Sequence, residues 1–187
     1  MSSSVVSTKG GVLSIDETGV ELHIPPNAFE AGIKEIEIDL RIIPYSSFGS
    51  SLSFEDHSTV MVEVKPNKLT LKRPASLFLP HCLKLKSTEH CEVRIFQSHH
   101  DAGEIPSWED ITQSVTYSLS ESCCVIHLKK FCWIKYTVHG NEVLGKNIML
   151  YVIGEQSDYD SEYVRVDVGY YPNLPGLNRV SNTSLKH

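Results

Sequence analysis

The sequence contains no segment of the kind that crosses or targets a membrane. None of the apolar runs among its 187 residues approaches the ~20 residues that a transmembrane helix requires. The N-terminal sequence Met1-Ser2-Ser3-Ser4 has neither the basic nor the apolar region of a signal peptide. We therefore predict no direct membrane insertion and a cytoplasmic location, which includes the cytosolic part of a membrane receptor or a submembrane scaffold.

Clustered positive charge is also missing. The chain has 17 Lys and Arg residues against 23 Asp and Glu residues, which gives a formal net charge of −6. The basic groups are small, such as Lys84 with Lys86 and Lys129 with Lys130. Binding to a phosphate backbone needs a concentrated basic face, because much of its affinity comes from counterion release. We therefore predict that nucleic acid is not a partner.

The cysteines follow neither a disulfide nor a zinc-site pattern. They are odd in number, and none forms a C-x-x-C pair: Cys82, Cys91, Cys123, Cys124 and Cys132. Several histidines follow Pro80-His81-Cys82, but zinc sites usually show paired ligands two to four residues apart, and this region has no such pairs. We predict no metal and no other cofactor, and we expect His81 and Cys82 to pack at the end of the fold.

Motifs of catalysis are equally absent. The chain has neither a G-x-S-x-G nucleophile elbow nor a glycine loop that could cradle a phosphate. Glu35, Glu37 and Asp39 share one face of a predicted strand, where a solvated surface accounts for them. We predict that the protein is not an enzyme and has no small-molecule substrate.

Alternation of apolar and polar residues dominates the chain. In Glu35–Ile42 four aliphatic residues alternate with four charged ones, as in a half-buried strand. Ten segments with strand patterns are Val20–Ile24, Glu35–Ile42, Val60–Val64, Ala75–Leu79, Glu92–Phe96, Thr116–Leu119, Cys124–Leu128, Trp133–Val138, Ile148–Ile153 and Tyr163–Val168. Short strands separated by turns are typical of a sandwich or barrel. We predict an all-β fold, an antiparallel β-sandwich followed by a partial second β unit.

Helix signals are few, and changes in composition indicate boundaries. Ser107–Asp110 resembles a capping box, and 27–33 could hold a single helical turn. We expect exposed loops at 45–58 and 157–162. We divide the chain into a sandwich domain at 8–140, a partial hairpin unit at 145–170 and a flexible tail at 171–187.

Three segments together carry a resemblance to a known family. The first contains Gly10-Gly11, Gly19 and the strand end Ile24-Pro25; the second runs from Pro74 to Pro80-His81-Cys82; the third is Lys130-Phe131-Cys132. Over residues 8–140 the chain resembles the ZU-5 domain of zonula occludens proteins, uncoordinated-five netrin receptors and ankyrins. Residues 145–170 resemble the start of the UPA domain that follows ZU-5 in several of those proteins.

Physical arguments assign roles to these motif residues. Gly10, Gly11 and Gly19 can adopt the positive φ angles of tight turns. Pro25 has no N–H to donate and would end strand pairing, and we expect Pro74 at the start of a strand, where proline is tolerated.

The resemblance implies a non-catalytic protein-interaction module of a scaffold, an adaptor or a receptor cytoplasmic region. Its partner would be another protein or an adjacent UPA or death domain of the same chain, packed against it to regulate signalling.

The alternative is self-processing at the Phe131–Cys132 bond. Some proteins that resemble this family cut themselves at a His-Phe-Ser tripeptide, where the histidine activates the serine. Here Cys132 stands at the nucleophile position and Lys130 at the histidine position. Lysine is normally protonated, and His127 lies an odd number of residues away, on the opposite strand face. We predict that the chain does not cleave itself.

Overall fold

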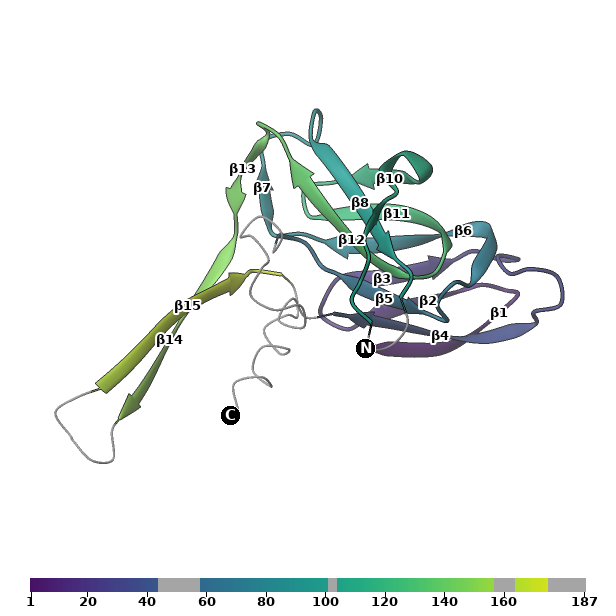
Figure 1. Ribbon diagram of the computed structural model, residues 1–187, viewed down its shortest axis with the longest axis horizontal. Coiled ribbons are helices and arrows are strands. Elements are labelled where there is room, and N and C mark those ends of the chain that lie inside the picture. The colour runs from purple at the N-terminus through teal and green to yellow at the C-terminus, as the bar shows by residue number, and fades with distance from the viewer. Residues whose placement is uncertain (44–57, 101–103, 157–163, 175–187) are drawn as a thin grey trace.

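The computed structural model describes residues 1–43, 58–100, 104–156 and 164–174. The loops expected at 45–58 and 157–162 lie outside the described residues, apart from Ser58. Residues 175–187 of the expected tail also lie outside them. Within the described ranges the chain is built almost entirely from strands, and no helix there is long and apolar enough to cross a membrane. Figure 1 shows a broad β body with a narrow hairpin extending from one end.

Two antiparallel sheets form the body. In the larger sheet the described strands follow the order β1 (Ser2–Ser7), β4 (Glu35–Ile42), β5 (Val62–Lys65), β12 (Trp133–His139), β8 (Glu92–Ser98) and β9 (Glu109–Asp110). In the smaller sheet the order is β10 (Thr116–Leu119), β11 (Cys123–Lys130), β6 (Thr70–Pro80), β3 (Val20–Ile24) and β2 (Gly11–Ile15).

The hydrophobic core lies between these sheets. Ile38 and Leu40 of β4 are completely buried, and Leu22 of β3 and Leu77 of β6 meet them from the other layer. Their charged or polar neighbours along each strand point outward, as period-two alternation requires. Each of the ten predicted segments overlaps a strand of the structure. The prediction of an all-β, antiparallel β-sandwich is therefore confirmed.

A small connecting sheet leads from the sandwich to the hairpin. It pairs β7 (Leu83–Leu85) with β13 (Val143–Lys146), and β14 (Ile148–Gln156) follows and pairs with β15 (Val164–Pro172). The hairpin runs two residues past the expected end at 170, and Leu174 is buried in the core. Residues 171–174 are thus part of the folded structure, which corrects our placement of them in a flexible tail.

Five described strands were not among the predicted segments: β1, β2, β7, β9 and β13. Strand β1 pairs with β4 at the edge of the larger sheet, although its sequence is rich in serine. Val6 is the one residue of β1 that reaches the core. An edge strand with so little apolar content gives no alternation signal, so its pairing comes from the neighbouring strand β4.

Three local expectations were wrong. Ser107–Asp110 does not begin a helix, because Asp110 lies in β9 and accepts hydrogen bonds from the backbone N and Oγ1 of Thr112, at 2.9 and 2.6 Å. A single 3₁₀ turn follows at Thr112–Ser114. The stretch 27–33 forms turns and no helix. Pro74 lies inside β6, at the point where the register between β6 and β11 shifts and no ladder bond from its nitrogen is needed.

Candidate functional site

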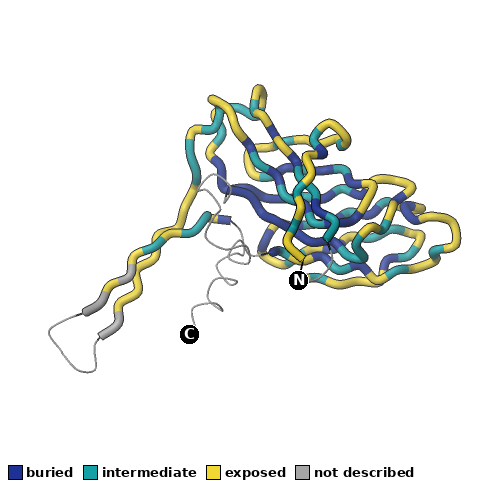
Figure 2. Tube along the Cα trace, viewed as in Figure 1, coloured by how far each residue is buried: buried dark blue, intermediate teal, exposed yellow. Residues whose placement is uncertain are grey.

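The two faces of the β14–β15 hairpin differ in how much apolar surface they expose. Cross-strand pairs such as Val152 with Val168 place alternate residues of both strands on the same face. One face, called the exposed face below, consists of side chains that are 40–70% exposed: Ile148, Leu150, Val152, Val166, Val168 and Tyr170. None of these side chains is charged. Figure 2 shows how strongly the hairpin contrasts with the buried interior of the sandwich.

The opposite face of the hairpin is partly covered by its own aromatic rings. The ring of Tyr151 lies directly over Gly169 and leaves no room there for a Cβ atom. Tyr151 also stacks with Tyr171, with ring centroids 6.2 Å apart. Met149 and Ile153 also lie on this face and are each about 40% exposed. The hairpin therefore shields one face internally and leaves the other to solvent or a partner.

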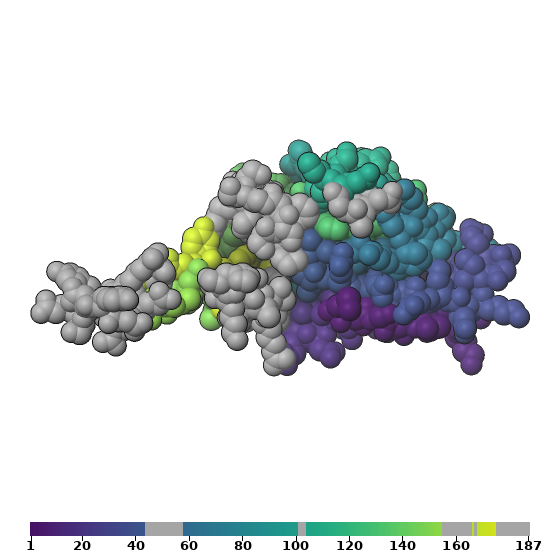
Figure 3. Space-filling view, turned by 60° about the horizontal axis from the view of Figure 1, so that its bottom comes forward, coloured from purple at the N-terminus to yellow at the C-terminus, as the bar shows by residue number. Residues whose placement is uncertain are grey.

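The base of the hairpin is fixed to the sandwich by backbone hydrogen bonds. The amide of Asn147, just before β14, donates to the carbonyl of Cys82 at 2.7 Å. The amide of Asn173, just after β15, donates to the carbonyl of Asn147 at 2.9 Å. Leu174 then enters the core. The Pro80-His81-Cys82 motif thus lies where the hairpin is attached to the sandwich. Figure 3 shows the hairpin's light-green and yellow atoms to one side of the sandwich.

His81 stabilises this attachment region through hydrogen bonds at both nitrogens of its ring. Its Nδ1 accepts a hydrogen bond from the amide of Leu83 at 3.2 Å, so its Nε2 carries the proton and donates to the carbonyl of Ser120 at 3.1 Å. Burial lowers the pKa of His81 and raises the pKa of the Cys82 thiol, which favours the neutral form of both. Among the described residues, no three His, Cys, Asp or Glu side chains are placed to share a metal ion. The packing role predicted for His81 and Cys82 matches their burial.

The first motif closes a tight crossing of the chain. Gly10 has a φ of +78° and lies against the backbone of Ile24 and Pro25, where a side chain would not fit. Gly19 also has a positive φ, whereas Gly11 does not and lies in β2, which corrects our expectation for that residue. Strand β3 ends at Ile24, directly before Pro25, as predicted.

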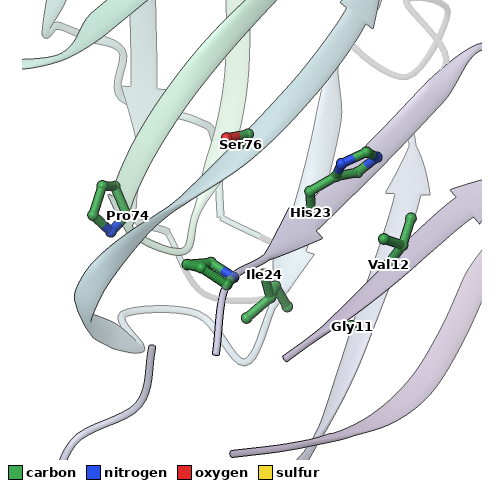
Figure 4. Close-up of a pocket in the computed structure, with 7 residues that line it drawn as sticks. Gly11, Val12, His23, Ile24, Pro74 and Ser76 are labelled. Atoms are coloured by element: carbon green, nitrogen blue, oxygen red, sulfur yellow. The ribbon is translucent and has the colours of Figure 1, made fainter. Parts of the chain in front are cut away.

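A shallow groove brings residues of the first two motifs together on the outer face of the smaller sheet (Figure 4). Its volume is about 330 Å³, and it is lined by Gly11, Val12, His23, Ile24, Pro25, Pro74 and Ser76. Nε2 of His23 lies within hydrogen-bond distance of Oε2 of Glu21, at 2.7 Å, and the His23 ring packs against Phe78 with ring centroids 4.5 Å apart. His23 is thus already engaged by neighbours on the same sheet.

Comparison with known proteins matches this fold and these motifs to one family. The model of the ZU5 domain matches residues 2–99, which is more than half of the chain. The chain belongs to the ZU5 domain family. The match begins at β1, so the strand that the sequence pattern missed is part of the family's own domain.

Individual relatives are tight junction proteins. The chain is 26% identical to rat tight junction protein ZO-1 and to dog tight junction protein 1, in each case over 132 residues that cover 68% of this chain and 7% of the relative. It is 36% identical to mouse tight junction protein 1 over 81 residues, which cover 42% of this chain and 5% of the relative. The chain therefore spans only a small part of the length of these relatives.

The ZU5 structure buries two of the three residues of the self-processing hypothesis and leaves Lys130 exposed. Phe131 and Cys132 are completely buried in the link between β11 and β12. The carbonyl of Phe131 accepts a hydrogen bond from the amide of Lys68 at 2.9 Å, and the Phe131 amide donates to the carbonyl of Leu69 at 2.9 Å. Burial raises the pKa of the Cys132 thiol to about 12, although the nearby Lys130 acts in the opposite direction. At neutral pH the thiolate is therefore scarce.

No base is placed to activate this thiol among its hydrogen-bond partners. The sulfur of Cys132 lies 3.8 Å from Oε1 of Gln97 and 3.9 Å from the carbonyl of Lys130, and neither oxygen accepts a proton at neutral pH. The ring of His127 is hydrogen-bonded to Ser76 at 3.1 Å on the outer face of β11, away from the core. The prediction that His127 faces away is confirmed. The geometry gives the hypothesis of cleavage no support.

The exposed face of the hairpin is the feature that sequence reasoning missed. We predicted both strands but assigned the hairpin no role as a surface. The signal was present, because Ile148–Ile153 is apolar at every position and lacks the alternation of a strand with one wet face. Such a run is typical of a strand that is covered on both sides.

Proposed function

We propose that this ZU5 domain is a non-catalytic protein-interaction module of a cytoplasmic scaffold, an adaptor or a receptor cytoplasmic region. The observation that carries the proposal is the exposed face of the β14–β15 hairpin, which presents six apolar side chains beside a well-packed sandwich. Contiguous apolar surface of this kind marks sites of protein association. The names of the relatives, tight junction proteins, agree with a structural role rather than a catalytic one.

In this proposal the sandwich and the hairpin have different roles. The sandwich at 8–140, with β1, is the ZU5 unit and provides a rigid base. The hairpin at 145–170 is the start of a second, UPA-like β unit whose apolar surface packs on a protein partner or an adjacent domain, such as a UPA or death domain, and so regulates signalling. Support for this division comes from β14, which is apolar on both faces and so resembles an interior strand.

A photocrosslinking experiment tests the proposal. A photoreactive phenylalanine analogue is placed at Val152 on the exposed face or, as the control, at Val12 beside the groove; these valines are 67% and 61% exposed. In cells, we expect protein adducts that depend on the probe at Val152. The recovered protein is then purified and titrated against wild-type chain and Val152→Arg, and we expect binding only to the wild type. Equal adducts from both positions, or equal binding by both chains, would contradict the proposal.

A further inference from the structure

Among the described residues, the exposed face of the hairpin is left open to solvent. A two-stranded hairpin is only marginally stable in water when both faces are wet. Residues 175–187, which the structure does not describe, carry just three aliphatic residues in their sequence: Leu177, Val180 and Leu185. Three side chains interrupted by polar residues cannot match six apolar side chains on a flat sheet. A contiguous apolar surface of this kind suits contact with another polypeptide surface.

From this geometry we infer that the exposed face binds the same face of a second copy of the chain. The inference takes from the proposed function only that the hairpin is a binding surface. The face contains no charged side chain, so a copy of itself meets no repulsion and needs no complementary charge. A surface that contacts itself around a two-fold axis has to be complementary to itself, which the order of its residues allows.

The sizes of the side chains change along the face in a self-complementary way. Ile148 with Pro172 at the base and Gln156 with Val164 at the tip are the outermost cross-strand pairs on this face. Between them, from base to tip, lie Leu150 with Tyr170, Val152 with Val168, and Gly154 with Val166. The large pair lies on one side of the central valines and the small pair on the other. A two-fold axis that crosses the strands at the central valines places Leu150 of one copy over Gly154 of the other. The same axis places Tyr170 over Val166, so large side chains meet small ones.

This arrangement also keeps the two sandwiches apart. The axis runs the two hairpins in opposite directions, so the base of each lies over the tip of the other. Because each sandwich is attached at a base, the bodies lie at opposite ends of the dimer (Figure 1). The hairpins themselves form a small four-stranded sandwich with its layers ~10 Å apart.

The surface available is sufficient for a dimer of moderate affinity. The six side chains expose roughly 600 Å² per copy, or about 1,200 Å² in the dimer, which is the lower end of the range for stable interfaces. We therefore expect association at micromolar concentrations of the chain.

Sedimentation equilibrium of the whole chain at concentrations between about 1 and 100 μM tests the inference, because we expect the dimer to form within this range. The wild type should dimerise, and Val152→Arg should raise the dissociation constant at least 100-fold because two buried arginines would face each other across the axis. Ile153→Arg, on the opposite face of the same strand, is the matched control and should dimerise like the wild type. Circular dichroism confirms that each variant is folded.

A charge-reversal pair keeps the test decisive. Residue 152 faces its own copy in this arrangement, so an equimolar mixture of Val152→Arg and Val152→Glu should form a heterodimer that neither variant forms as a homodimer. A wild type that stays monomeric at 100 μM, or a mixture that shows no rescue, overturns the inference. If the wild type is monomeric while the probe at Val152 still captures a different protein, the self-association fails and the proposed function stands.

Discussion

Single residues of the first motif explain why the chain can cross itself so closely. Gly10 and Gly19 have nearly the same φ, +78° and +71°, but different surroundings. A Cβ on Gly10 would collide with the backbone of Ile24, Pro25 and Pro26, whereas a Cβ on Gly19 would meet only Pro80 at an ordinary contact distance of 3.9 Å. Substitutions at the two glycines therefore distinguish two energetic costs. Both carry the cost of a side chain at positive φ, but only a substitution at Gly10 adds a steric collision with the backbone.

We predict that Gly10→Ala is much more destabilising than Gly19→Ala. Gly19→Ala adds only the conformational cost of a left-handed residue, about 1 kcal/mol in the free energy of unfolding. Gly10→Ala adds a collision with backbone that cannot move independently, for a total of about 3 kcal/mol or more. Urea denaturation of both variants measures the difference. Equal losses would mean that the crossing at Ile24–Pro25 is looser than described.

The buried imidazole of His81 makes stability depend on pH. Burial is the main cause of its lowered pKa, and the hydrogen bond to Ser120 opposes the shift. Above the ordinary value of 6.5, neither the folded nor the unfolded state binds the proton. Below 6.5 the unfolded state binds it first, so the free energy of unfolding falls as the pH falls towards the lowered pKa of the folded state. The protonated ring would also lose the hydrogen bond that Nδ1 accepts from Leu83.

We predict a lower melting temperature at pH 5 than at pH 7.5, and a smaller difference in His81→Asn. Each unit of pKa shift corresponds to about 1.4 kcal/mol. His99 has a pKa lowered in the same direction, chiefly by burial, so His99→Asn serves as a second variant that should remove its own share. Calorimetry of the three proteins at both pH values measures these shares. A pH dependence that is unchanged in His81→Asn would show that the histidine titrates normally in the fold.

Strands could be predicted where apolar and polar residues alternate along the sequence. They could not be predicted where a strand forms because it pairs with an adjacent strand of the sheet. The bounds of Glu35–Ile42 follow from its pattern, because one face of β4 is buried and the other is wet. Strand β1 has no such pattern and exists because β4 offers it an edge to pair with. The local signature at Ser107–Asp110 fits a helix cap and an Asp-centred turn equally well, and pairing of Asp110 with Phe96 decides for the strand.

The site was predictable only in part for the same reason. His81 and Cys82 could be placed at the end of the sandwich from their residue types, but the hairpin that stands on them depends on contacts far apart in sequence. The amide of Asn147 donates a hydrogen bond to the carbonyl of Cys82, 65 positions earlier in the sequence. No local pattern encodes such a bond, so the attachment of the hairpin to the sandwich emerges only from the assembled fold, although the apolar run Ile148–Ile153 was visible in the sequence.

For strand β4 we predict that Ile38→Asp unfolds the sandwich. Ile38 is completely buried in the core, and a carboxylate there would have no cation to pair with on its own strand face. The cost is several kcal/mol, comparable to a domain stability of ~5–15 kcal/mol. Val12→Asp is the control, because Val12 is 61% exposed on β2 and should tolerate the charge. A cooperative melt of Ile38→Asp within a few degrees of the wild type would show that the core is assigned wrongly.

The intact molecule should remain one polypeptide. Cleavage before Cys132 would require a thiolate, but burial raises the pKa of that thiol to about 12, so very little thiolate exists at pH 7. We predict a single species of 21.0 kDa by mass spectrometry after prolonged incubation at pH 7. Lys130→His restores the histidine of the self-cleaving tripeptide and is the most sensitive variant to examine. Fragments that end at Phe131 in the wild type would contradict the non-catalytic proposal.

Leu174 is a hydrophobic connection between the hairpin and the sandwich. It follows β15 and is 1% exposed in the core, so it ties the second strand of the hairpin to the sandwich. We predict that Leu174→Ala lowers the free energy of unfolding by about 2–4 kcal/mol, because it leaves a cavity in a packed core. Leu144→Ala, at a leucine that is 58% exposed in β13, should cost less than about 1 kcal/mol.

The effect of Leu174→Ala should also be uneven across the molecule. Amides of β14 and β15 should exchange their hydrogens faster than in the wild type, because the hairpin loses its anchor at one end and opens locally. Amides at the centre of the sandwich, such as that of Leu22, should keep their relative exchange rates. Their exchange should become faster only as far as the free energy of global unfolding falls. Hydrogen exchange followed by mass spectrometry resolves the two regions. Uniform acceleration across hairpin and sandwich would show instead that the two parts unfold as a single cooperative unit.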